Sequence, residues 1–139
     1  MAIKRVTPVE AWKNWPYFER HIEKVLKRID GGVNADDVFA RVQLGTMQLW
    51  CNDEHDAIAV TEIQCYPNHK VLLMFMVSGE HAKKWFTEGQ EHFDAFARRS
   101  GCKYVEFTGR SGWEKLARAH GFEEKFIHMR KNVKGADYG

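Results

Sequence analysis

The seven residues Val-Leu-Leu-Met-Phe-Met-Val at positions 71–77 form an uninterrupted apolar run. Such a run offers no polar face to water and is typical of a central strand covered on both sides. Ser78 follows, and apolar side chains then recur at helical spacing up to Gly101, which predicts a helix capped by Ser78 and ending near Ser100. The apolar stripe of this helix comprises Ala82, Trp85, Phe86, Phe93, Phe96 and Ala97. A buried strand followed by a long helix is therefore expected to organise the fold.

Shorter strand patterns lie on the N-terminal side of the run. Residues 47–51 and 57–65 are predicted strands, and polar turns at 52–56 and 66–69 join them to each other and to the run. The first third of the chain is expected to be helical after a short strand at 3–6. The helix boundaries there are indicated by a capping box at Thr7, Pro8 and Glu10, a break at Pro16, glycines at 31 and 32, and the pair Asn34 and Gly45.

The last third of the chain predicts strand, helix and strand. These elements are expected at 104–107, 113–120 and 122–131, with Gly121 ending the helix and a polar, frayed tail at 132–139. The chain is expected to be one domain, 1–139, of the α+β class. Its sheet should be mixed but mostly antiparallel, with about six strands flanked by four to five helices.

Composition narrows the function classes. The 139 residues carry 21 Lys and Arg against 19 Asp and Glu, a formal charge of +2, which argues against a strongly cationic nucleic-acid binder. Three cysteines are too few for a disulfide framework and favour a reducing compartment. No segment has the length and hydrophobicity of a membrane span or an export signal, so we expect a protein that is not secreted.

Metal and nucleophile patterns are weak. Cys51 with His55 and Cys65 with His69 suggest half-sites for zinc, but the strand between them separates the pairs by roughly 26 Å, so no metal is expected. No nucleophile or phosphate-loop motif is present. Glu62 and Glu106 are carboxylates within predicted strands, where burial raises a pKa, and each is a candidate base or an ordinary paired residue.

The order of elements resembles the GNAT superfamily of N-acetyltransferases over the whole chain. Local segments also resemble a family of small, GNAT-like proteins encoded by tailed bacteriophages. These segments are Met47-Gln48-Leu49-Trp50, Ala59-Val60-Thr61-Glu62-Ile63, Tyr66-Pro67, Gly101-Cys102, Val105-Glu106 and Gly109-Arg110-Ser111-Gly112-Trp113. The resemblance implies location in the bacterial host cytoplasm or in the virion, other phage proteins as partners, and a possible oligomer.

The superfamily resemblance also implies where acetyl-CoA would bind. Its pyrophosphate is held at the start of the long helix, which here corresponds to Val77, Ser78, Gly79, Lys83 and Lys84. This turn has one glycine, and Glu80 adds a negative charge. The usual tyrosine acid on the short helix is absent, which leaves His120 as the substitute, and the central strand carries no carboxylate base.

Three functions follow as alternatives. The first is a phage structural or assembly protein without acetyl transfer or cofactor, acting through a surface that includes Trp12, Trp15, Tyr17 and Trp50. The second is an acetyl-CoA-dependent N-acetyltransferase using Glu62, Glu106 or His120. The third is a module that binds a small ligand or peptide between the central strand and the strand at 104–107. Gly109, Arg110, Gly112 and Trp113 are expected to form a structural turn, with Arg110 paired to Glu106 or Glu62 and Trp113 buried.

Overall fold

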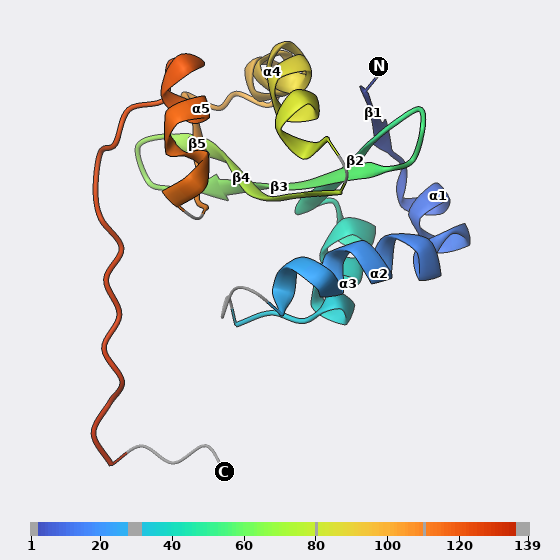
Figure 1. The fold of residues 1–139 in the computed structure, drawn as a ribbon, viewed down its shortest axis with the longest axis horizontal. Coiled ribbons are helices and arrows are strands. Elements are labelled where there is room, and N and C mark those ends of the chain that lie inside the picture. Colours follow the sequence, from blue (N-terminus) through green and yellow to red (C-terminus); the bar gives the residue numbers. More distant parts are fainter. Residues whose placement is uncertain (1–2, 28–31, 80, 110, 136–139) are drawn as a thin grey trace.

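The apolar run lies in β4 (Lys70–Gly79), inside a five-stranded sheet. The computed structural model describes residues 3–27, 32–79, 81–109 and 111–135. In this part of the chain the strands are ordered β1-β2-β3-β4-β5, and neighbours are antiparallel except the parallel pair of β4 and β5. The predicted α+β class with a mixed, mostly antiparallel sheet is confirmed, although the sheet has five strands where about six were expected (Figure 1).

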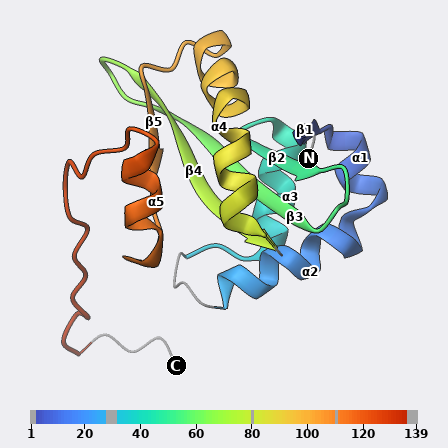
Figure 2. The ribbon, with the colours of Figure 1, turned by 45° about the horizontal axis from the view of Figure 1, so that its top comes forward.

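Helices cover both faces of the sheet. The strands are β1 (Ile3–Val6), β2 (Met47–Asn52), β3 (Ala57–Cys65), β4 and β5 (Tyr104–Phe107). The helices are α1 (Pro8–Lys13), α2 (Trp15–Leu26), α3 (Ala35–Leu44), α4 (Ala82–Arg99), the 3-10 turn η1 (Ser111–Trp113) and α5 (Glu114–Ala119). α1, α2 and α3 lie on one face, α4 lies on the other, and α5 lies beside β5 (Figures 1 and 2). Among the described helices, none is long and apolar enough to cross a membrane.

Local capping explains the helical first third. The Thr7 hydroxyl accepts a hydrogen bond from the backbone N–H of Glu10 at 3.1 Å, so the predicted capping box is present. Asn34 caps α3 in the same way, accepting from the N–H of Asp37 at 2.8 Å. Gly45 ends α3 with a φ of 85°, which glycine adopts without steric cost.

Each face of the sheet has its own apolar core. The core under α1, α2 and α3 includes Phe18, Ile22, Val38, Val42, Leu49, Ile58, Val60 and Met76. The core under α4 includes Trp50, Ala59, Leu72, Met74, Trp85, Phe86, Phe93 and Phe96. The predicted stripe of α4 is thus confirmed at its aromatic positions, since Trp85, Phe86 and Phe93 are fully buried.

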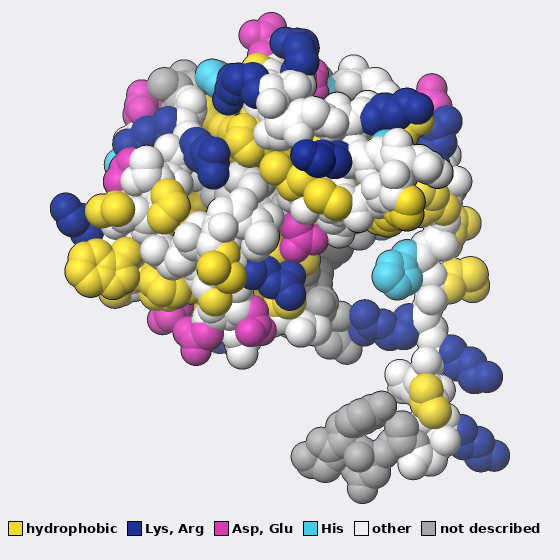
Figure 3. Space-filling view, turned by 180° about the vertical axis from the view of Figure 1, so that it is seen from behind, with side chains coloured by type: hydrophobic (Ala, Val, Ile, Leu, Met, Phe, Trp, Pro, Cys, Tyr) yellow, Lys and Arg dark blue, Asp and Glu magenta, His cyan; other side chains and the backbone are white. Residues whose placement is uncertain are grey.

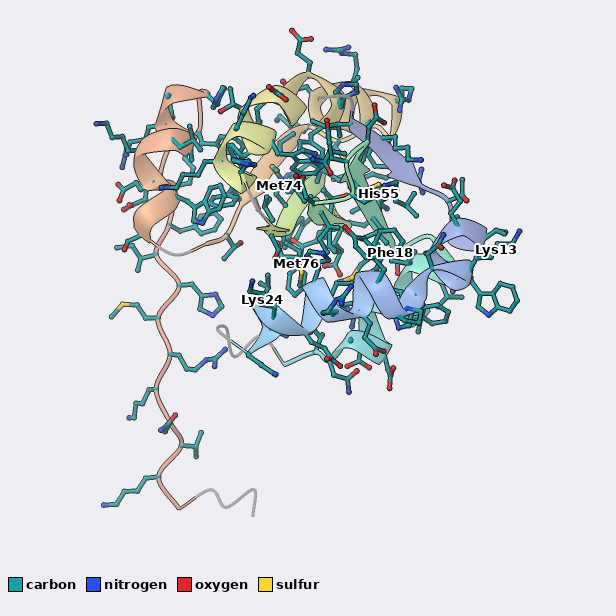
Figure 4. All side chains as sticks on the ribbon, turned by 45° about the vertical axis from the view of Figure 1, so that its right-hand side comes forward. Lys13, Phe18, Lys24, His55, Met74 and Met76 are labelled. Atoms are coloured by element: carbon teal, nitrogen blue, oxygen red, sulfur yellow. The ribbon has the colours of Figure 1, made fainter. Side chains whose placement is uncertain are left out.

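A β-bulge interrupts β4 at Phe75. Val60 of β3 pairs with Met76, but the next residue, Thr61, pairs with Met74, so Phe75 is an extra residue on β4. In a regular strand Met74 and Met76 would share a face. Here Met74 packs under α4 and Met76 packs against α2 (Figure 4). The bulge therefore reverses the faces of the last part of β4.

Two sequence predictions are wrong. Ser78 does not begin the long helix: it is 8% exposed, lies within β4 and pairs with Ile58 of β3. The helix begins at Ala82 after His81, because hydrogen bonding to β3 extends the strand to Gly79. The expected strand at 122–131 is not formed either. This segment is extended but pairs with no strand of the described chain, so it has no ladder of hydrogen bonds.

A chain of buried polar groups crosses the α4 face of the sheet. The indole N–H of Trp50 donates to the Thr61 hydroxyl at 3.0 Å, and this hydroxyl donates to Gln48 Oε1 at 2.8 Å. The Gln48 amide in turn donates to the carbonyl of Gly45 at 3.2 Å. Thr61 thus provides a hydrogen-bond partner for the indole N–H of Trp50 and for Gln48 Oε1, neither of which has access to water.

Thr61→Val is expected to destabilise the protein by about 2–4 kcal/mol. Valine keeps the shape of threonine but leaves the Trp50 N–H and the Gln48 oxygen buried without partners. Urea denaturation followed by tryptophan fluorescence measures the change. Thr108→Val, at an exposed position just after β5, is the matched control and should change stability by less than about 0.5 kcal/mol. Equal effects of the two substitutions would show that the buried chain of hydrogen bonds contributes nothing.

Candidate functional site

The parallel strands β4 and β5 pair over only part of the length of β4. Pairing runs from Val71 opposite Tyr104 to Met74 opposite Phe107, where β5 ends. β4 continues through the bulge to Gly79, still paired with β3 but no longer with β5. We call the region between residues 75–79 of β4 and the end of β5 the strand opening. It leads to the N-terminus of α4.

Gly79 closes the turn between β4 and α4 and packs against the loop at 52–56. Its φ is 115°, and a Cβ built there would overlap the carbonyl oxygen of Asp56 and approach the Cα of Ala57 to 2.6 Å. The loop is held by Asn52, whose side-chain oxygen accepts from the N–H groups of Asp56 at 3.1 Å and Ala57 at 3.2 Å. Glycine is thus required at position 79 by close backbone packing.

The first turn of α4 is basic. His81 precedes it in the left-handed conformation, with a φ of 57°, and no side chain caps the helix. Lys83 and Lys84 are exposed, and Lys84 forms an ion pair with Glu88 at 4.0 Å. Val77 is half-buried in the core under α4, and Ser78 is buried. Of the five cofactor candidates, only the two lysines present side chains to solvent. Glu80 lies outside the described residues.

An aromatic cluster joins α4 to β5 and α5. The ring of Phe86 lies 5.5 Å from Phe107, 5.6 Å from Trp113, 6.1 Å from His120 and 6.2 Å from Phe122. We call these five residues the Phe86 cluster. Trp113 packs against Phe86 and Phe107 but is half-buried, whereas a buried ring was expected, and α5 has no side-chain cap and begins through η1.

Glycine is not equally required across this turn. A Cβ on Gly109 would come within 2.5 Å of the Phe107 ring, whereas a Cβ on Gly112 would meet nothing within 4 Å. Arg110 lies outside the described residues, so its predicted ion pair stays a prediction.

The three acid–base candidates lie in separate places. Glu62 points toward α3, where its carboxylate accepts from Arg41 at 3.1 Å and from the Gln64 amide at 3.0 Å. Glu106 is half-buried on β5 between Val105 and Phe107, which pack under α4, so Glu106 points away from α4. Glu62 and Glu106 both pair with Leu73 of β4, which puts them on the same face of the sheet but two strands apart, about 9–10 Å between their backbones.

His120 follows α5 and lies on the other side of the sheet from Glu62. Its Nε2 is 3.1 Å from the Thr87 hydroxyl of α4. That hydroxyl also donates to the carbonyl of Lys83 at 3.2 Å, which links His120 to the first turn of the helix. The structure therefore does not bring Glu62, Glu106 and His120 together into one acid–base site.

The four candidate interface residues divide into exposed and buried positions. Trp12 is 64% exposed on α1. Trp15 is half-buried, with its indole N–H donating to Glu19 at 3.0 Å and its ring against Phe39. Trp50 is 4% exposed and packs between Phe93 and Phe96, so its prediction as a surface anchor is wrong. The alternation of β2 turns Trp50 toward α4.

Tyr17, the fourth interface candidate, lines a hollow of about 460 Å³ together with Cys51 and His55. The Tyr17 hydroxyl is buried and has no hydrogen-bond partner among the described residues. Burial raises the pKa of Tyr17, and burial likewise raises the pKa of the Cys51 thiol. A buried thiol of raised pKa is a poor nucleophile. Cys51 and His55 lie at one end of β3 and Cys65 and His69 at the other, and the described residues contain no metal-binding cluster.

Sequence reasoning did not single out Phe75 or Asn52, and it placed Phe86 in the core stripe of the long helix without its contacts to β5 and α5. Phe75 creates the bulge, Asn52 holds the loop against Gly79, and Phe86 is the centre of the aromatic cluster. Asn52 gave a usable signal, because Asn at the end of a strand often accepts from backbone N–H groups of the following turn. Phe75 gave none, since it stands inside an unbroken apolar run.

Several solved structures have a fold similar to that of this chain. No protein-family model and no curated protein matches the sequence. A probable acetyltransferase superposes with a TM-score of 0.69 at 12% identity, covering 99% of each chain. A predicted acetyltransferase with acetyl-CoA from Clostridium acetobutylicum gives 0.69 at 9% identity, covering 94% of this chain and 95% of that chain. An acetyltransferase of Trypanosoma brucei gives 0.68 at 12% identity, covering 95% and 99%. Together with the strand order and the β4–β5 opening, these similarities show that the chain has the GNAT fold.

Proposed function

We propose that this chain is a GNAT-fold protein that does not transfer acetyl groups and acts through protein–protein contacts, as a structural or assembly component of a bacteriophage particle. The observation that carries the proposal is the dispersal of the ionisable groups. Acetyl transfer from acetyl-CoA needs a base within hydrogen-bond reach of the acceptor amine. Glu62 is held by Arg41, Glu106 lies two strands away from Glu62 across Leu73, and His120 contacts Thr87 on the α4 side of the sheet.

The turn at the N-terminus of α4 fits acetyl-CoA poorly. In the expected binding mode, backbone N–H groups of the turn hold the pyrophosphate, and small residues let it approach. Gly79 is present, but the Asp56 carbonyl already occupies the space beside it. Lys83 and Lys84 supply positive charge, but the ion pair with Glu88 partly neutralises the charge of Lys84. The glycine is accounted for by the packing of the loop, which leaves two surface lysines as the support for a cofactor site.

A protein-binding role has support on the surface. Trp12 on α1 is 64% exposed, and Trp is enriched at the centres of protein interfaces. The segment after α5 exposes further large apolar side chains, among them Phe126 at 73% and Met129 at 85%. Phe126, Ile127 and Met129 lie close together in this segment, and exposed apolar groups concentrated in one place are typical of surfaces that a partner covers.

An N-acetyltransferase is the second candidate, and two observations favour it. The bulged β4, the strand opening and the basic first turn of α4 are all present. A solved neighbour of the same fold is named with acetyl-CoA. In this case His120, linked through Thr87 to the first turn of α4, is the best-placed titratable group.

Calorimetry with acetyl-CoA separates the two candidates. We expect no binding tighter than about 1 mM, which corresponds to about −4 kcal/mol, and no release of CoA thiol with a panel of amines and polyamines. Lys83→Glu tests any weak binding, and Lys24→Glu on α2, on the other face of the sheet, is its matched control (Figure 4). Micromolar binding lost only in Lys83→Glu, with turnover abolished by His120→Ala or Glu62→Gln, would establish the enzyme and refute our proposal.

A further inference from the structure

The edge of the sheet at β5 has a hollow beside it. β5 is the last strand of the sheet, and its outer edge pairs with no strand of the described chain. A hollow of about 920 Å³ lies along this edge, lined by α4 on one side and by the start of the C-terminal segment on the other. Its lining includes Asp94, Arg98, Tyr104 and Glu106. An open edge of this kind presents unpaired N–H and C=O groups to any extended peptide.

The same chain carries an extended segment that its own body does not bury. Residues 122–135 have no helix or strand, and they lead away from the body beyond α5 (Figures 1 and 3). Phe126, Ile127, Met129 and Val133 are between 70% and 85% exposed. From Ile127 to Arg130 apolar and basic side chains alternate, which places the two kinds on opposite faces of a strand. This is the pattern that predicts a strand from the sequence alone.

The segment is poorly built to fold back onto its own β5. Phe122 anchors it against Phe86 and Phe107, 6.2 Å and 6.4 Å away. Between Phe122 and Gly135 the segment has no glycine or proline, and Asn132, near its far end, is its only residue typical of tight turns. At about 3.3 Å per residue, the eight residues 126–133 extend for about 26 Å, enough to cover β5 and both its flanks in another molecule.

We infer that the chain forms a dimer in which residues 123–133 of each copy pair with the β5 edge of the other. Donor strand and acceptor edge lie on one chain, so two reciprocal exchanges give a closed, twofold-symmetric pair in which both β5 edges are paired. The exchanged strand buries its apolar face in the hollow and supplies each sheet with a sixth strand. Asp94 on the α4 side of the hollow and Glu106 on its other side offer acceptors to basic residues of the incoming strand, such as Lys131. This inference does not depend on the presence or absence of acetyl transfer.

Light scattering after size-exclusion chromatography tests the dimer. We expect the mass of a dimer at micromolar concentration and a melting temperature that rises with protein concentration. The double variant Ile127→Asp with Met129→Asp should be monomeric and should keep its far-UV circular dichroism, because both side chains are exposed in the single chain. Val9→Asp changes an apolar residue on α1 that is 59% exposed and should leave the dimer intact. A monomeric natural sequence, or a dimer that survives the double variant, would overturn the inference.

Cysteine cross-linking distinguishes exchange between molecules from pairing within one. Cys102 precedes β5 and lines the hollow. In a Cys65→Ser background, single cysteines placed in turn at 125–131 should form disulfides with Cys102 that join two chains on a non-reducing gel. The same series with Cys102→Ser is the control. Disulfides formed within a monomer would show that the segment returns to its own β5 and would refute strand exchange.

Discussion

Gly79→Val is expected to destabilise the fold by about 3 kcal/mol or more. Position 79 has a φ of 115°, which valine adopts only with strain, and a Cβ there would overlap the Asp56 carbonyl. The obstacle is backbone held by Asn52, so it cannot move aside as a flexible side chain would. Urea denaturation at constant pH measures the change in the free energy of unfolding.

Gly101→Ala is the control that separates strain from overlap. Gly101 has a φ of 77°, also left-handed, but a Cβ there would meet nothing within 4 Å. Its substitution should cost about 1 kcal/mol, from backbone conformation alone. If Gly79→Val proves no more harmful than Gly101→Ala, the loop at 52–56 has room to withdraw and the packing argument fails.

Phe86→Ala is expected to cost about 3–5 kcal/mol and to loosen α5. Phe86 is fully buried, and its ring contacts residues of β5, η1 and the segment after α5. Much of the aromatic packing that fixes α5 to the body runs through this one ring. Denaturation gives the stability, and amide hydrogen exchange over 111–122 gives the local opening.

An exposed aromatic residue provides the comparison. Trp12→Ala removes a ring that is 64% exposed and should change stability by less than about 0.5 kcal/mol. Exchange over 111–122 should be unchanged in it. Should Phe86→Ala lose stability while exchange at 111–122 stays slow, α5 is held by contacts other than the Phe86 cluster.

Elements whose signals are local could be predicted from the sequence. The capping box at Thr7, the break before Pro16 and the glycine stop at Gly45 act within one helical turn, so the residues alone identify them. The strand at 57–65 was predicted with both boundaries correct, because polar turns flank it. Elements decided by distant contacts could not be predicted. Ser78 is a good helix cap by preference, yet pairing with Ile58 keeps it in the strand.

The candidate site depended even more on tertiary structure. Trp50 next to a turn suggested a surface residue, but a strand residue is buried or exposed according to which face the sheet presents to its helices. The carboxylates of Glu62 and Glu106 lie on strands as predicted, but only the register shows that they share a face two strands apart, and only the fold shows that Arg41 holds Glu62. The C-terminal segment has the pattern of a strand, and pattern alone cannot say whether a partner strand lies within reach.

The bulge at Phe75 ties the orientation of side chains to the number of residues in β4. Because one residue is extra, Val77 faces α4, as Leu72 and Met74 do, although odd and even positions should alternate. An alignment that places this strand without a gap on an unbulged relative will therefore assign the wrong face to every position after 75. A β4 lacking one residue at 75 or 76 would keep each remaining side chain on its present side. It would also lose the extra bend and twist that a bulge gives a strand. The shape of the strand opening therefore depends on the number of residues in β4. A comparison of residue identities alone will overlook this dependence.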